Sequence, residues 1–222
     1  MKPFLYSLFL VSGLSLLLLA EPVATTANAS GGATTMPKQC EPGKTSPEAM
    51  GWRWRANTTV RINYLKDNFS VAEAEALSRA VNNWNSALRE IDSQVLFIID
   101  GEGVAHDGAS ITVMRGLPRG KERVGEIRFH SMSNGRVRLV VIINPVVTDL
   151  NALTSLMTHE LGHSLGLADC YECRRGTTAM AAFKSNNKGN DVYEPSACDK
   201  YVVAAGYAGQ TSAQARVAQI ER

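Results

Sequence analysis

Two histidines stand four residues apart in this sequence, and a glutamate directly follows the first of them. On a helix, His159 and His163 would project from one face, one turn apart. Both imidazoles could then bind one zinc ion at about 2 Å. Zinc lowers the pKa of a bound water towards about 7, and the carboxylate of Glu160 could take the proton of that water. The spacing therefore predicts a Zn2+ site with a general base beside it.

A catalytic zinc takes three protein ligands and leaves one position open, so one more ligand must come from outside this helical turn. Gly166 lets the chain leave the helix, and Asp169 follows three residues later with a carboxylate, an acceptable zinc ligand. We therefore predict Asp169 as the third ligand. The alternatives are that Asp169 only caps or salt-bridges the loop, and that Glu172 or Glu194 binds the metal instead.

The helix that carries these histidines is predicted from about residue 149 to residue 165. Apolar residues recur along one side of it at helical spacing, and Gly166 stands where a left-handed helix stop would fall. The apolar positions are Leu150, Leu153, Leu156 or Met157, and Leu161.

The preceding sequence predicts a sheet and another long helix. Residues 58–65 alternate between apolar and polar, which is typical of a strand, and Ser70 with Glu73 matches a capping box that opens a helix to Ile91. Asn134-Gly135 favours a tight hairpin, so the strands that flank it should be antiparallel neighbours. Further strands are predicted at 95–99, 110–114, 125–132 and 137–143, and a last helix at about 196–205. The sum is one mixed sheet with a few long helices.

The stretch from His159 to Asp169 resembles the metzincin zinc peptidases, whose pattern H-E-x-x-H-x-x-G-x-x-H precedes a turn with a methionine. The similarity covers roughly residues 52–207 and is greatest to matrixin-like bacterial enzymes and snapalysins. It implies an α+β fold with a mixed, mostly parallel sheet, an antiparallel edge strand, an active-site helix and a Met-turn at Met180. The usual third histidine is Asp169 here, and snapalysins resemble this chain in having aspartate there.

The resemblance implies a zinc-dependent endopeptidase that hydrolyses peptide bonds by Glu160-assisted attack of zinc-bound water. An extended protein or peptide substrate would add along the strand at 125–132. The alternative is a catalytically weak or inactive secreted binding protein with the same fold, although such a protein would have no need of Glu160.

Matrixins suggest two further features. Many of them bind a structural ion through loops rich in His and Asp, and residues 101–108 of this chain include His106 and Asp107. Their pro-segment carries a thiolate that blocks the zinc, and Cys40 could act in that way. The competing expectation is that Cys40 is paired, because the number of cysteines is even.

The beginning of the chain predicts export. Lys2 precedes an apolar run over residues 4–20, and small residues offer cleavage after Ala20 or Ala29, so residues 1–29 are predicted as a signal peptide. The alternative is a membrane anchor, since the run is about as long as the shortest spanning helices. Residues 30–51 are expected to form a flexible lead-in or short pro-segment.

Composition bounds the remaining choices. The chain has 222 residues and a net charge of +2, which suits one catalytic domain at 52–222 and, without a basic block, gives no case for nucleic acid. We expect a secreted or periplasmic monomer without membrane contact once the signal is removed. Export makes the four cysteines candidates for disulfide bonds.

Overall fold

The computed structural model describes residues 36–65, 67–102, 110–120, 122–131, 137–182 and 191–220, with the backbone alone for 209–220. All of them belong to one unit, Gly32–Arg222. The predicted signal peptide, the Asn134-Gly135 turn and the loop with His106 lie outside the described residues.

Five strands form one mixed sheet in the order β2-β1-β3-β5-β4. β1 pairs in parallel with β2 and β3, and β3 pairs in parallel with β5, whereas β4 runs antiparallel to β5 at the edge. The predicted α+β class, with a mostly parallel sheet and an antiparallel edge strand, is confirmed. The strands are β1 (Thr59–Tyr64), β2 (Leu96–Glu102), β3 (Ser110–Arg115), β4 (Gly125–Ser131) and β5 (Val137–Ile143).

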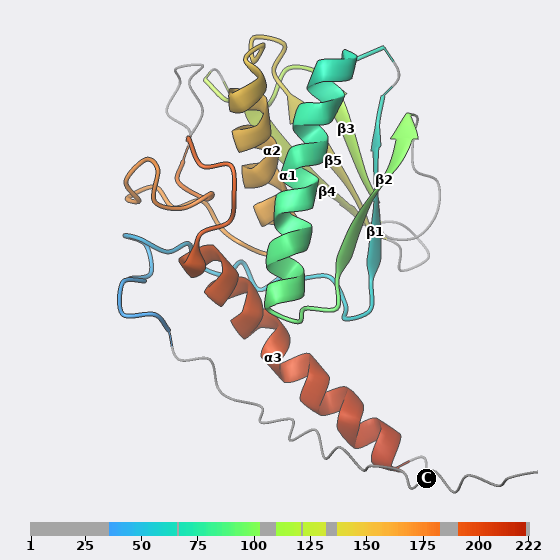
Figure 1. Ribbon diagram of the computed structural model, residues 1–222, viewed down its shortest axis with the longest axis vertical. Helices are drawn as coiled ribbons and strands as arrows, with labels where there is room; N and C mark the ends of the chain where they lie inside the picture. The colour runs from blue at the N-terminus through green and yellow to red at the C-terminus, as the bar shows by residue number, and fades with distance from the viewer. Residues whose placement is uncertain are drawn as a thin grey trace, which may run out of the picture. The chain divides into compact units, whose positions relative to one another are not determined.

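Two helices, α1 (Val71–Glu90) and α2 (Leu150–Ser164), lie side by side on one face of this sheet (Figure 1). The predicted capping box begins α1: Ser70 Oγ accepts a hydrogen bond from the amide of Glu73, and the Glu73 carboxylate accepts one from the amide of Ser70. None of the helices that the structure describes is long and apolar enough to cross a membrane.

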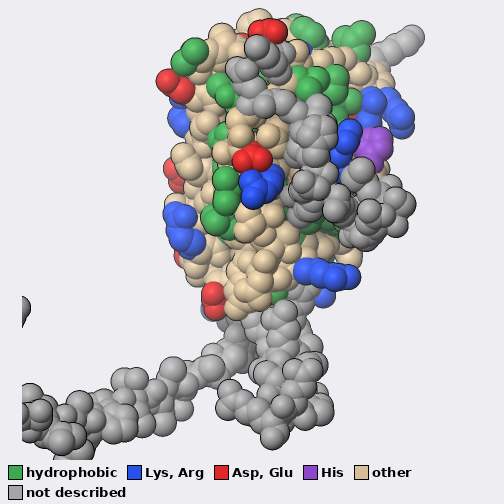
Figure 2. Space-filling view, turned by 90° about the vertical axis from the view of Figure 1, so that its right-hand side faces the viewer, with side chains coloured by type: hydrophobic (Ala, Val, Ile, Leu, Met, Phe, Trp, Pro, Cys, Tyr) green, Lys and Arg blue, Asp and Glu red, His purple; other side chains and the backbone are tan. Residues whose placement is uncertain are grey.

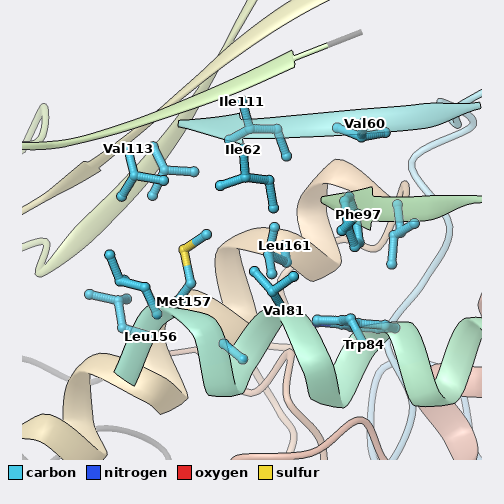
Figure 3. Packing of buried hydrophobic residues seen from close by; sticks show 14 of the residues in the cluster. Val60, Ile62, Val81, Trp84, Phe97, Ile111, Val113, Leu156, Met157 and Leu161 are labelled. Carbon is cyan, nitrogen blue, oxygen red and sulfur yellow. The ribbon is translucent and has the colours of Figure 1, made fainter. Parts of the chain in front are cut away.

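The core fills the space between the sheet and these helices (Figure 3). Ile62 and Ile111 point from the sheet towards Leu161 of α2, and all three are buried. Trp84 of α1 is fully buried as well, and its indole N–H donates to the carbonyl of Thr158 at 2.7 Å. This bond joins α1 to α2 one residue before His159. Packing against α1 therefore helps to hold the helix that carries the two histidines.

The third helix, α3 (Ala197–Ile220), is longer than the helix predicted at 196–205. A disulfide joins Cys198 in its first turn to Cys40, 158 residues earlier in the sequence. Beyond Cys40, residues of the expected lead-in are fixed to the exit of α2. Ala49 forms a β-bridge with Leu167, and the amide of Met50 donates to the carbonyl of Gly166 at 2.7 Å.

The surface seen in Figure 2, from the side on which β2 lies in Figure 1, carries acidic and basic side chains among hydrophobic ones. Arg61 of β1 and Asp100 of β2 form an exposed ion pair at 3.0 Å.

Candidate metal centre

α2 holds the two histidines in fixed orientations. His159 Nδ1 lies 2.8 Å from the carbonyl oxygen of Ala179, and His163 Nδ1 lies 2.8 Å from that of Leu167. An Nδ1–H that donates to a carbonyl selects the tautomer whose Nε2 carries a lone pair, the form that binds metal. The two Nε2 atoms face each other at 3.1 Å.

Asp169 reaches the same point from the loop after α2. Its Oδ1 lies 3.1 Å from His159 Nε2 and 3.5 Å from His163 Nε2. The three side chains form the one group of potential metal ligands among the described residues. Glu172 and Glu194, the alternative ligands, are exposed and lie outside that group.

Gly166 makes this return of the chain possible. It has a φ of +89°, in the left-handed region predicted for the helix stop. A Cβ at this position would lie 1.8 Å from the carbonyl oxygen of Trp52, so a side chain would also displace the segment that packs there. Glycine is therefore required both by the backbone turn and by the close approach of residue 52.

The distances between the three donor atoms fit a zinc ion. Zinc binds imidazole nitrogen and carboxylate oxygen at about 2.0–2.1 Å in a tetrahedral arrangement, which separates the ligand atoms by about 3.3 Å. The separations here are 3.1, 3.1 and 3.5 Å. With both Nδ1 atoms donating to carbonyls, three lone-pair-bearing atoms converge on one point, as a cation requires. His159, His163 and Asp169 would hold the metal.

The charges of the group favour a cation at the same point. Burial alone would raise the pKa of Asp169, but hydrogen bonds and charge interactions with His159 and His163 hold it well below its usual range. Burial would lower the pKa of His163, yet Asp169 and Glu160 together raise it. The negative charges of Asp169 and Glu160 therefore favour a cation beside His163.

Glu160 lines the same cleft but lies outside the group of three potential ligands. Its side chain is buried, with 3% of the residue exposed, and burial raises its pKa. Its Oε2 accepts no hydrogen bond from any part of the chain that the structure describes. Gly125 of β4 makes room for the carboxylate, because a Cβ there would lie 2.6 Å from Glu160 Oε1. A carboxylate in this environment is a stronger base than one in water.

A cleft of about 300 Å³ opens over these groups, and β4 forms one of its walls. Tyr171 stands at the rim, largely exposed, and its hydroxyl donates to Asp169 Oδ2 at 3.1 Å. The negative charge of Asp169 raises the pKa of Tyr171, so this hydroxyl remains a donor at neutral pH. Tyr171 was not predicted as a site residue from the sequence. Only its position, two residues after Asp169, could have indicated that it lies near the site.

Met180, the residue to which the resemblance assigns a Met-turn, packs against Gly162 of α2. It is fully buried, and its sulfur lies 2.3 Å from where a Cβ of Gly162 would be, so the two residues are in close contact. Asp199 of α3 fixes the turn: its carboxylate accepts hydrogen bonds from the Thr178 hydroxyl and from the amide of Ala179, the latter at 2.9 Å. The same carboxylate accepts a hydrogen bond from the amide of Ser196 at 2.8 Å, at the start of α3.

All four cysteines are paired, as expected from their even number. Cys40 is bonded to Cys198, and Cys170 to Cys173 beside Asp169. In this pairing Cys40 has no thiolate to offer a metal, which speaks against the alternative that Cys40 blocks the zinc.

Comparison of the sequence with models of known protein families, and with curated proteins, finds no match. The geometry by itself allows a specific chemistry. Three donors can hold a divalent cation, and Glu160 can exchange a proton with a molecule bound in the cleft.

Proposed function

We propose that this protein is a secreted zinc-dependent endopeptidase of the metzincin type, with His159, His163 and Asp169 as metal ligands and Glu160 as general base. The observation that carries the proposal is the convergence of three metal-binding atoms within 4.8 Å, at the floor of a cleft that also contains a buried carboxylate. A structural zinc site is closed by four protein ligands, whereas this set of three is typical of a catalytic one.

Zinc, when bound, supplies a lowered pKa for a coordinated water and a positive charge that polarises the carbonyl under attack. Glu160 accepts the proton of the attacking water and passes it to the leaving amine. Its burial raises its pKa towards the working pH, which suits a group that must both take and return a proton.

The edge strand β4 supports an extended peptide as substrate. The amide of Asn144 donates to the carbonyl of Val124 at 2.9 Å, and in an antiparallel pair only every second residue bonds to the partner strand. Gly125, Ile127 and Phe129 therefore turn their backbone amides and carbonyls towards the open edge. A peptide that adds a strand there would pass Glu160 at Gly125, so protein or peptide chains are the proposed substrates.

Two observations support the metzincin assignment and the extracellular or periplasmic location. The element order runs from a strand and a long helix through four strands to the helix with the histidines, and Met180 lies buried against Gly162 of that helix. The two disulfides suit an oxidising compartment.

The test uses purified mature protein with its zinc content measured. Wild-type protein should bind one zinc per chain and hydrolyse casein, and a chelator should abolish the hydrolysis until zinc is restored. Glu160→Gln should keep the zinc and the fold but lose at least about a hundredfold in activity, because general-base catalysis is removed. Glu75→Gln, an exposed position on α1, is the matched control and should behave as wild type.

Full activity in zinc-loaded Glu160→Gln protein would refute the assignment of the base. Wild-type protein that binds zinc but cleaves no peptide bond would instead favour the alternative function, a secreted binding protein of the same fold.

A further inference from the structure

The two oxygens of Asp169 have different partners. Oδ1 faces the Nε2 atoms of His159 and His163, at 3.1 and 3.5 Å, and is the oxygen that would bind the metal. Oδ2 accepts a hydrogen bond from the Tyr171 hydroxyl at 3.1 Å. A carboxylate can bind a metal through one oxygen or through both, and here a separate donor engages the second oxygen.

The backbone around Tyr171 is held on both sides. The disulfide between Cys170 and Cys173 closes a small ring that contains Tyr171. The amide of Cys170 donates to the carbonyl of Met180 at 2.7 Å, and its carbonyl accepts from the amide of Ala182 at 3.2 Å. The backbone at Tyr171 is therefore held in place, although the residue as a whole is 66% exposed.

We propose that Tyr171 is a positioning residue of the metal site: its hydroxyl holds Oδ2 of Asp169, so that the carboxylate binds the metal through Oδ1 alone. This inference rests on the metal site of the proposed function. Its consequence is that one coordination position stays open, as a catalytic zinc requires. The disulfide ring at Cys170 and Cys173 serves this arrangement by fixing where the hydroxyl lies.

The first test compares Tyr171→Phe with wild type by zinc affinity and by the visible spectrum of the cobalt-substituted protein. Phenylalanine keeps the ring and removes only the donor. Zinc affinity should fall by about ten- to a hundredfold, the range typical of losing a hydrogen bond to a metal ligand. The cobalt bands should weaken, because a carboxylate that binds through both oxygens raises the coordination number. Tyr193→Phe, whose side chain does not line the cleft, should match wild type in both measurements.

The second test asks whether Tyr171 acts through Asp169. In an Asp169→His background the third ligand has no second oxygen, so adding Tyr171→Phe should leave zinc affinity unchanged. An equal loss in both backgrounds would overturn the proposal, since Tyr171 would then support the loop in general. Unchanged zinc affinity, or an unchanged cobalt spectrum, in the single Tyr171→Phe variant would also overturn it.

These readouts separate this inference from the proposed function, because neither depends on hydrolysis. Wild-type protein that binds zinc but fails to cleave casein would remove the peptidase proposal while leaving the tests of Tyr171 intact. Conversely, a Tyr171→Phe variant with wild-type zinc affinity would remove the role of Tyr171 and leave the peptidase proposal standing.

Discussion

Replacing Gly162 by alanine should destabilise the protein, although alanine is the better helix former. A Cβ at this position would lie 2.3 Å from Met180 Sδ and 3.3 Å from a ring carbon of Trp84. Both neighbours are fully buried, so neither can move towards solvent. Overpacking of a core costs about 1–3 kcal/mol, and helix preference returns about 0.8–1.0 kcal/mol. We expect the free energy of unfolding to fall by about 1 kcal/mol, and by at most about 2 kcal/mol.

The assay is urea unfolding in the presence of a chelator, so that metal binding does not contribute to the measured stability. Gly206→Ala is the matched control: it lies within α3, and its Cβ would meet only the Arg53 side chain, at 3.9 Å. That variant should be more stable than wild type by about 0.8–1.0 kcal/mol. In a Met180→Ala background Gly162→Ala should be less destabilising than in wild type, because only the contact with Trp84 at 3.3 Å remains. If Gly162→Ala is stabilising while Met180 is intact, the inferred tight contact is wrong.

The remaining predictions concern the proposed third ligand and an ion pair, Glu73 with Arg115, that does not line the cleft. Asp169→Ala should lose zinc affinity by well over the ten- to hundredfold that is typical of changes outside the ligand set. Asp169→His should recover part of the affinity, and Asp169→Asn should bind zinc poorly. Titration with a zinc indicator measures all three variants, and wild-type affinity in the alanine variant would contradict the ligand assignment. Burial acts to raise the pKa of Glu73, but hydrogen bonds from Ser70 and Arg115 lower it below its usual value. Ionised Glu73 therefore stabilises the fold at any pH above its unfolded pKa of about 4.3. This contribution is lost as the pH falls through the lower pKa of the folded state. The stability difference between wild type and Glu73→Gln should therefore shrink on acidification below about pH 4.3, and a constant difference in urea unfolding would refute it.

Local patterns were sufficient for the start of α1 and for the group of potential metal ligands. The capping box at Ser70 begins α1 as predicted, because its two hydrogen bonds join residues three apart and are written in the local sequence. Likewise Asp169 lies within one turn of the exit from α2, so spacing and the glycine at 166 were enough to bring it into the group.

Long-range contacts could not be predicted in this way. Residues 30–51 have the composition of a flexible segment, but Cys40 is bonded to a cysteine 158 residues later, and no local pattern encodes that partner. Asp199 and Tyr171 were missed as supporting residues for a related reason. The hydrogen bond from the amide of Ser196 to Asp199 joins residues three apart and is local. The bond from the amide of Ala179 to Asp199 depends instead on how α3 packs against the rest of the chain.

These long-range contacts support the orientation of two of the three potential ligands. His159 is oriented by the carbonyl of Ala179, and the amide of Ala179 is in turn bound by Asp199. Asp199 is next to Cys198, whose disulfide to Cys40 fixes the start of α3 to the N-terminal segment. His163 is oriented by the carbonyl of Leu167, in the exit turn of α2 to which Ala49 is bridged. Because the carbonyl of Ala179 engages Nδ1 of His159, Nε2 is the nitrogen left for the metal, and a shift of α3 would disturb the orientation of this ring. The N-terminal segment would thus support the proposed metal site in two ways, by holding the start of α3 through Cys40 and by holding the exit turn of α2 through Ala49.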